Sequence, residues 1–147
     1  MQRHRYTTEF GVSLLKQFEG FRSTTYVCPG GKATVGYGHA IKEGENFSDG
    51  ITEEEGEELL KKDLFFAERA VSRLVRVPLT NGQFDSLVSF TYNLGSAALQ
   101  RSALRMKLNR GESQDASKEF LKWCWAGGKK LRGLSKRRRA ERELFLG

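Results

Sequence analysis

Apolar residues recur every three or four positions in several stretches of the chain, and polar residues or glycines bound each stretch. The first stretch predicts an amphipathic helix that ends near Phe18, with Thr7 or Thr8 placed to cap its start and Gly20 placed to close its end. Its apolar positions are Phe10, Leu14, Leu15 and Phe18. This helix would present Glu19 at its C-terminal end.

The longest apolar repeat predicts a helix over about residues 52–75. Thr52 and Glu55 form a capping-box pattern at its start, and Val77-Pro78 ends it. Its apolar positions are Leu59, Leu60, Leu64, Ala67, Val71 and Leu74. A helix of this length is suited to link two parts of a small protein.

A second capping box, Thr80 with Gln83, predicts a central helix that reaches about Tyr92 and is closed by Gly95. Shorter helices are predicted over Ser102 to Asn109, over Ser113 to Trp125 with Gly127-Gly128 as the stop, and over about Lys136 to Leu146. The C-terminal half therefore reads as entirely helical.

Between the first two helices, the pattern changes to short runs rich in Thr, Tyr and Val. Ser23 to Val27 and Ala33 to Tyr37 flank Pro29-Gly30-Gly31, which predicts a β-hairpin, and a third strand is expected around Ala40 to Phe47. The fold class is therefore α+β. We expect a single domain over residues 1–147, with a small three-stranded sheet lobe (about 20–50), the linking helix, and a larger helical lobe (about 78–147 plus the N-terminal helix).

Composition narrows the choice of partner and compartment. The chain has 147 residues and a formal charge of +7, which suits a polyanion such as nucleic acid or an anionic cell envelope. The N-terminus has no apolar run long enough for a signal peptide or a membrane anchor, so synthesis in the cytoplasm is expected. Two cysteines, Cys28 and Cys124, are too few for a disulfide framework, and we expect both to be reduced.

Candidate chemistry gathers on the predicted hairpin. Cys28 would lie at the end of its first strand and Thr34 near the start of its second, so both can approach Glu19 at the preceding helix end. A carboxyl at the negative end of a helix dipole is helped to stay protonated. The sequence thus predicts an acid, a thiol and a hydroxyl around a cleft between the two lobes.

The spacing of these residues resembles the signature of the phage-type lysozymes, the endolysins that cut bacterial peptidoglycan: Glu, eight residues, Asp or Cys, five residues, Thr. Two further segments, Phe90-Thr91-Tyr92-Asn93-Leu94-Gly95 and Gly133-Leu134-Ser135-Lys136-Arg137-Arg138 with Glu141, resemble motifs of the same family in the same order. The resemblance implies a lysozyme-like fold and a muramidase that cleaves the β-1,4 bond between N-acetylmuramic acid and N-acetylglucosamine. It implies no cofactor and no metal.

The resemblance also assigns roles to residues. Glu19, Cys28 and Thr34 would be catalytic, where many relatives have Asp in place of Cys28. Arg137, or failing that Arg138, would pair with Glu19. His39 and Asp63 would form a stabilising pair. Asn93 would either cap a helix end or donate a hydrogen bond to a sugar N-acetyl group.

Some alternatives stay open at this point. In one alternative Cys28 acts as an anion, either as a nucleophile or as a base. In the other it is a passive neighbour of a water that Thr34 positions. The rival function is a catalytically decayed, basic cell-wall-binding module. A nucleic-acid binder is disfavoured because the basic run from Lys129 to Arg139 has no interleaved aromatic residues.

The expected partners are peptidoglycan and the anionic cell envelope, and the protein should be a monomer. A cell-wall enzyme made in the host cytoplasm would need a membrane-permeabilising holin for release to the periplasm, without direct contact between the two proteins.

Overall fold

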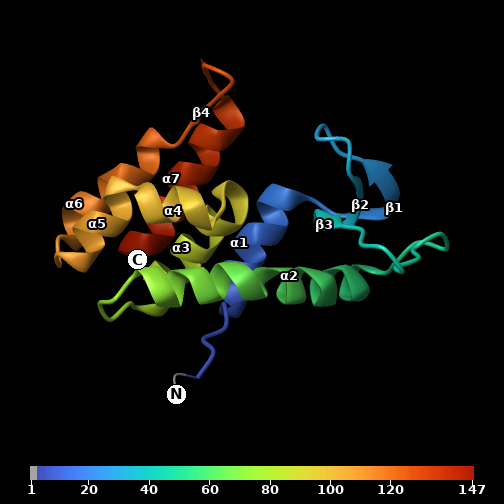
Figure 1. The fold of residues 1–147 in the computed structure, drawn as a ribbon, viewed down its shortest axis with the longest axis horizontal. Helices are drawn as coiled ribbons and strands as arrows, with labels where there is room; N and C mark the ends of the chain where they lie inside the picture. The colour runs from blue at the N-terminus through green and yellow to red at the C-terminus, as the bar shows by residue number, and fades with distance from the viewer. Residues whose placement is uncertain (1–2) are drawn as a thin grey trace.

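The computed structural model describes residues 3–147. Helix α1 (Glu9–Glu19) leads into a three-stranded antiparallel sheet of β1 (Arg22–Val27), β2 (Ala33–Gly36) and β3 (His39–Ala40), in the order β1-β2-β3. Helix α2 (Glu53–Leu74) follows, and Figure 1 shows it running from beneath the sheet to the far side of the helical body. The predicted α+β architecture, a small sheet beside a larger helical part, is confirmed.

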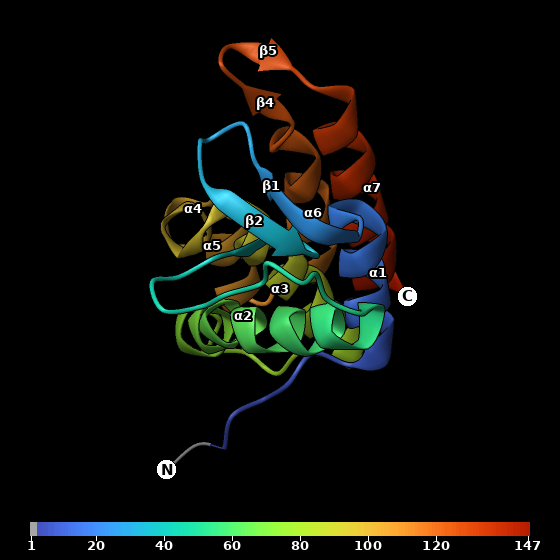
Figure 2. The same cartoon turned by 90° about the vertical axis from the view of Figure 1, so that its right-hand side faces the viewer.

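The C-terminal half is built around helix α3 (Asn81–Leu94). The remaining elements are α4 (Ser96–Arg101), α5 (Ala103–Asn109), α6 (Ser113–Glu119), a 3-10 turn η1 (Phe120–Lys122), the two-stranded hairpin β4 (Trp125–Ala126) and β5 (Lys129–Lys130), and α7 (Arg132–Leu146). Figure 2 shows that the β4–β5 hairpin projects toward the same end of the molecule as the β1–β2 turn.

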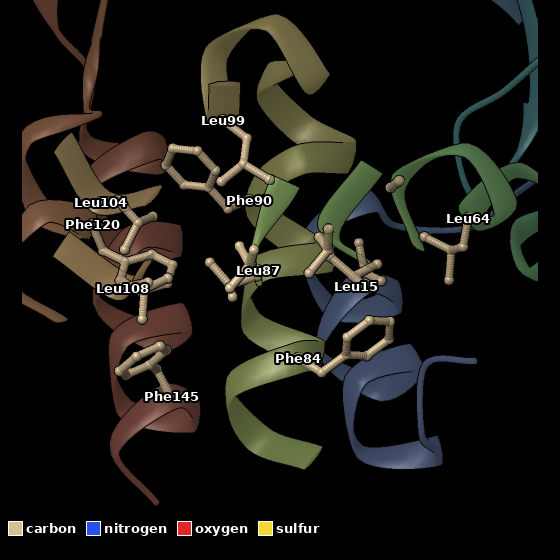
Figure 3. Close-up of a cluster of buried hydrophobic side chains, with 14 of the residues drawn as sticks. Leu15, Leu64, Phe84, Leu87, Phe90, Leu99, Leu104, Leu108, Phe120 and Phe145 are labelled. Atoms are coloured by element: carbon tan, nitrogen blue, oxygen red, sulfur yellow. The ribbon is translucent and has the colours of Figure 1, made fainter. Parts of the chain in front are cut away.

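Helix α3 is buried on all sides over residues 84–91, because α1, α2 and α7 all pack against it. A helix in this position needs apolar or fully paired residues around its whole circumference. Figure 3 shows the resulting core, in which Phe84, Leu87 and Phe90 of α3 lie between side chains of the surrounding helices.

Both predicted capping boxes are present. Thr52 accepts from the Glu55 backbone N–H at the start of α2 and Thr80 accepts from that of Gln83 at the start of α3, and in each case the Glu or Gln side chain accepts from the backbone N–H of its threonine. Thr8 is the N-cap of α1, but its side chain makes no capping bond. Its hydroxyl instead donates to Asp85.

Buried carboxylates tie the N-terminal segment to the helical body. Glu68 of α2 accepts hydrogen bonds from the Thr7 backbone N–H (2.7 Å) and hydroxyl (2.6 Å), and it lies 2.8 Å from His4 Nε2. Asp85 of α3 accepts from the Thr8 backbone N–H at 3.0 Å. These contacts lie at the end of α1 remote from Glu19.

Several predicted boundaries are wrong. The third strand was expected around Ala40 to Phe47 but covers only His39–Ala40, because the chain then turns at Gly44 and Gly50, both at positive φ. The helix expected to reach Trp125 ends at Glu119 and is followed by the 3-10 turn η1, and Gly127-Gly128 forms the turn of the β4–β5 hairpin. Helix α4 was not predicted, and α7 begins at Arg132, four residues before the expected start.

No helix within residues 3–147 is long and apolar enough to cross a membrane.

Candidate active site

Glu19 lies at the C-terminal end of α1, where Gly20 closes the helix with φ +70° and donates its N–H to the Lys16 carbonyl. Its side chain is 21% exposed. Arg137 Nη1 of α7 donates to Glu19 Oε2 at 2.7 Å. The structure therefore assigns the pairing with Glu19 to Arg137 rather than to Arg138.

Arg137 is buried and is fixed from two further sides. Its Nη2 lies 3.3 Å from both the carbonyl and the hydroxyl oxygen of Ser89, and its Nε lies 3.3 Å from Glu141 Oε2. A charge-assisted contact from a guanidinium held in this way restricts the orientation of the Glu19 carboxyl.

A groove of about 430 Å³ opens beside this ion pair. Residues from α1, α3 and the start of α7 line it: Phe18, Glu19, Asn93, Leu131, Gly133, Leu134 and Arg137. Asn93 Oδ1 accepts from Arg138 Nη2 at 2.8 Å, so the amide NH₂ of Asn93 is the group available to donate into the groove.

The sheet approaches Glu19 through the turn between β2 and β3. A Cβ built on Gly38 would lie 3.1 Å from Glu19 Oε1, and Gly38 has φ +82°. Glycine is needed here both for the backbone conformation and for the close approach to the carboxyl.

Cys28 and Thr34 are not among the residues lining that groove; they lie together on the β1–β2 hairpin. The Cys28 backbone N–H and the Thr34 hydroxyl both donate to the Lys32 carbonyl, each at 3.0 Å. Hydrogen bonds from the backbone of Lys32 and Gly30 lower the pKa of the Cys28 thiol. The hairpin therefore makes this thiol easier to deprotonate than a free cysteine.

His39 is buried between two carboxylates. Its Nδ1 lies 2.8 Å from Asp63 Oδ2 and its Nε2 lies 3.0 Å from Glu45 Oε1, so the expected contact with Asp63 is present. Burial lowers the pKa of His39, but the hydrogen bonds to Asp63 and Glu45 more than offset this, and the net shift is upward. These contacts link the start of β3 to the middle of α2 and to Glu45 in the loop after β3.

Sequence reasoning did not assign site roles to Ser89, Tyr92 or Gly38. Burial, together with the charges of Asp63 and Glu19, raises the pKa of Tyr92, so its hydroxyl stays protonated. Gly38 could have been found from its Gly-Tyr-Gly-His context, whereas the partners of Ser89 depend on the packing of α3 against α7 and leave no local signal.

The class of protein follows from comparison with known proteins. The phage lysozyme family model matches residues 16–141. The endolysin of Bacillus phage B103 is 45% identical over 141 residues, covering 95% of this chain and 53% of that protein. The endolysin of Acyrthosiphon pisum secondary endosymbiont phage 1 is 40% identical over 144 residues, covering 95% of this chain and 97% of that protein.

Solved structures agree with the sequence comparison. A crystal structure of a P22 lysozyme mutant superposes with a TM-score of 0.89 at 38% identity, covering 97% of this chain and 99% of that one. The chain has a lysozyme-like fold. It belongs to the phage lysozyme family, although it spans only about half the length of the B103 endolysin.

Proposed function

We propose that this protein is an endolysin, a muramidase that hydrolyses the β-1,4 bond between N-acetylmuramic acid and N-acetylglucosamine in bacterial peptidoglycan and thereby lyses the host cell. The observation that carries this proposal is the Glu19 carboxyl, held by Arg137 in the wall of a groove of about 430 Å³. The endolysins among its relatives support the same reaction class.

Glu19 is the general acid. Cleavage of a glycosidic bond requires a proton donor for the leaving oxygen and a second group on the opposite face of the sugar. Glu19 is partly exposed, so a sugar can reach it, and the contact from Arg137 fixes its orientation. Arg137 donates to Oε2, which leaves Oε1, on the side of Gly38, to carry the proton.

Cys28 and Thr34 supply the second group. The Thr34 hydroxyl donates to the Lys32 carbonyl, so its lone pairs are left to accept a hydrogen bond from a water molecule and orient it. The lowered pKa of the Cys28 thiol makes its deprotonation easier, and in the proposed mechanism Cys28 reacts as the thiolate. The Cys28 thiolate then acts as an anion on the reaction path, either attacking the sugar or stabilising its developing positive charge.

Asn93 holds the substrate and the His39–Asp63 pair holds the site together. The Asn93 side chain uses its oxygen to accept from Arg138, so its NH₂ group can donate a hydrogen bond to the N-acetyl oxygen of a sugar. The ion pair of His39 with Asp63 keeps the sheet against α2, so that the hairpin carrying Cys28 and Thr34 stays in place relative to Glu19.

The proposed setting follows from this reaction. Peptidoglycan is the substrate and the anionic cell envelope is the surface that the basic protein meets. The enzyme is made in the host cytoplasm as a monomer and reaches the wall from the periplasmic side once a holin has opened the membrane. Several relatives are named SAR-endolysins, including that of bacteriophage PS119 at 35% identity over 131 residues.

The test is clearance of chloroform-permeabilised Gram-negative cells, followed as a fall in turbidity. The Glu19→Gln variant keeps nearly the same shape but has no transferable proton, so we expect its rate to fall roughly 100 to 10,000-fold while its circular dichroism spectrum is unchanged. A variant that clears cells at the parent rate would show that Glu19 is not the acid. A parent protein that binds cell walls but does not clear them would favour the decayed binding module.

A further inference from the structure

Glu141 of α7 is a fully buried carboxylate at the centre of a charged cluster. Its Oε2 accepts from the Ser89 hydroxyl at 2.6 Å, from Arg138 Nη2 at 3.0 Å and from Arg137 Nε at 3.3 Å. Its Oε1 forms a close ionic contact with Arg138 Nε at 2.7 Å. One carboxylate therefore contacts both arginines and anchors them to α3.

Each of the two arginines contacts a different residue of the groove. Arg137 reaches Glu19 at 2.7 Å, and Arg138 reaches Asn93 Oδ1 at 2.8 Å. Arg138 is fully buried and packs over the Phe90 ring at 5.3 Å, so it has no exposed surface from which to bind substrate itself. Its guanidinium connects Glu141 to Asn93 as that of Arg137 connects Glu141 to Glu19.

We propose that Glu141 is a positioning residue that sets, through Arg137 and Arg138, the orientation of both the Glu19 carboxyl and the Asn93 amide. This inference rests on the proposed function, in which Glu19 is the acid and Asn93 binds the sugar. Glu141 itself touches no substrate. Its negative charge holds two guanidinium groups side by side that would otherwise repel each other, and its hydrogen bond from Ser89 fixes the carboxylate against α3.

A structural role alone would have a different signature. Any buried carboxylate with several hydrogen-bond partners contributes to folding, and Glu68 provides the matched case: it is 3% exposed, holds His4 and Thr7, and contacts no groove residue. Glu141→Gln and Glu68→Gln remove the same charge from similarly buried sites. Only Glu141→Gln should change the orientation of Glu19 and Asn93 in the groove.

The experiment compares these two variants in rate against peptidoglycan concentration, thermal unfolding and side-chain ¹⁵N resonances. Displacement of a catalytic group by about 1 Å costs about 100-fold, so we expect Glu141→Gln to lose between ~10 and ~100-fold in kcat and also to raise KM. It should shift the Arg137 Nε and Asn93 amide resonances. Glu68→Gln should lower the melting temperature and leave kcat, KM and those resonances unchanged.

A double-mutant cycle then separates positioning from stability. If Glu141 acts on kcat through Arg137, Glu141→Gln should cause no further loss of kcat in an Arg137→Met background. Full additivity of the two losses would overturn the proposal.

Should Glu141→Gln fail to fold, Glu141→Asp provides the decision, because it keeps the negative charge but shortens the side chain and so moves the carboxylate away from Arg137 and Arg138. We expect it to lower kcat several-fold and shift the Arg137 resonance; parent kcat with an unmoved resonance would overturn the proposal. The resonances report on positioning without turnover, so an inactive parent protein would refute the proposed function and leave this test intact.

Discussion

Substitution of Gly38 by alanine should impair the site through a single added methyl group. Gly38 has φ +82°, and a left-handed backbone costs a residue with a Cβ about 1–2 kcal/mol. For a chain of this size that corresponds to a fall in melting temperature of roughly 2–8 °C. The new Cβ would also lie 3.1 Å from Glu19 Oε1, so the carboxylate must shift by a few tenths of an ångström.

The loss of activity follows from that shift. Since displacement of a catalytic group by about 1 Å costs about 100-fold, a shift of a few tenths predicts a loss of roughly 3 to 10-fold in kcat/KM. Turbidity clearance at a temperature well below unfolding measures the rate, and circular dichroism measures the melting temperature.

Gly44→Ala is the matched control for this prediction. Gly44 has φ +89°, and a Cβ there would have no neighbour within 4 Å, so the variant has the same backbone strain without contacting Glu19. Both variants should lose similar stability, and only Gly38→Ala should lose rate. Equal rates in the two variants would refute the claim that Gly38 positions the acid.

Three further predictions concern ionic and nucleophilic groups. Cys28→Asp should retain much of the lytic rate and Cys28→Ala should lose it, because a carboxylate can replace the thiolate and a methyl group cannot; an alanine variant as active as the parent would exclude an anionic role. The raised pKa of His39 means that its ion pairs stabilise the fold fully below about pH 6.5 and that this contribution is lost as pH rises through the folded-state pKa. Asp63→Asn should therefore flatten the fall in melting temperature from about pH 6 to pH 9, and an unchanged slope would contradict this. Lytic rate should fall as salt rises past about 0.15 M, where charges are screened beyond about 8 Å. The reason is that a group of basic residues has no ion-pair partner within residues 3–147 and is left to attract an anionic wall. A salt-independent rate would show that charge does not capture the substrate. These residues are Lys129, Lys130, Arg132, Lys136 and Arg139.

The sequence predicted those parts of the fold that depend on local chemistry. The two capping boxes located the starts of α2 and α3 because each is a reciprocal pair of hydrogen bonds within four residues. The hairpin β4–β5 was missed because Gly127-Gly128 was interpreted as a helix stop. A two-residue Gly-Gly loop is equally a hairpin signal, and both glycines have positive φ as such a turn requires.

The candidate site was proposed from the sequence for the same reason. Glu19, Cys28 and Thr34 lie within one continuous segment, so their spacing alone could indicate a shared role. Glu141 and Ser89 are 52 residues apart, and their contact exists only because α7 packs against α3. No pattern along the chain records such a contact, which is why the buried cluster behind Arg137 became visible only in the structure.

The most direct test of the proposed reaction is the chemical identity of the chain ends that the enzyme makes in purified peptidoglycan. Mass spectrometry of the released fragments, after borohydride reduction, identifies the sugar at each new reducing end. A hydrolysing muramidase predicts reduced N-acetylmuramic acid at every new end, with one water added for each bond cut. New ends of N-acetylglucosamine, or of an anhydro sugar formed without water, would contradict the account.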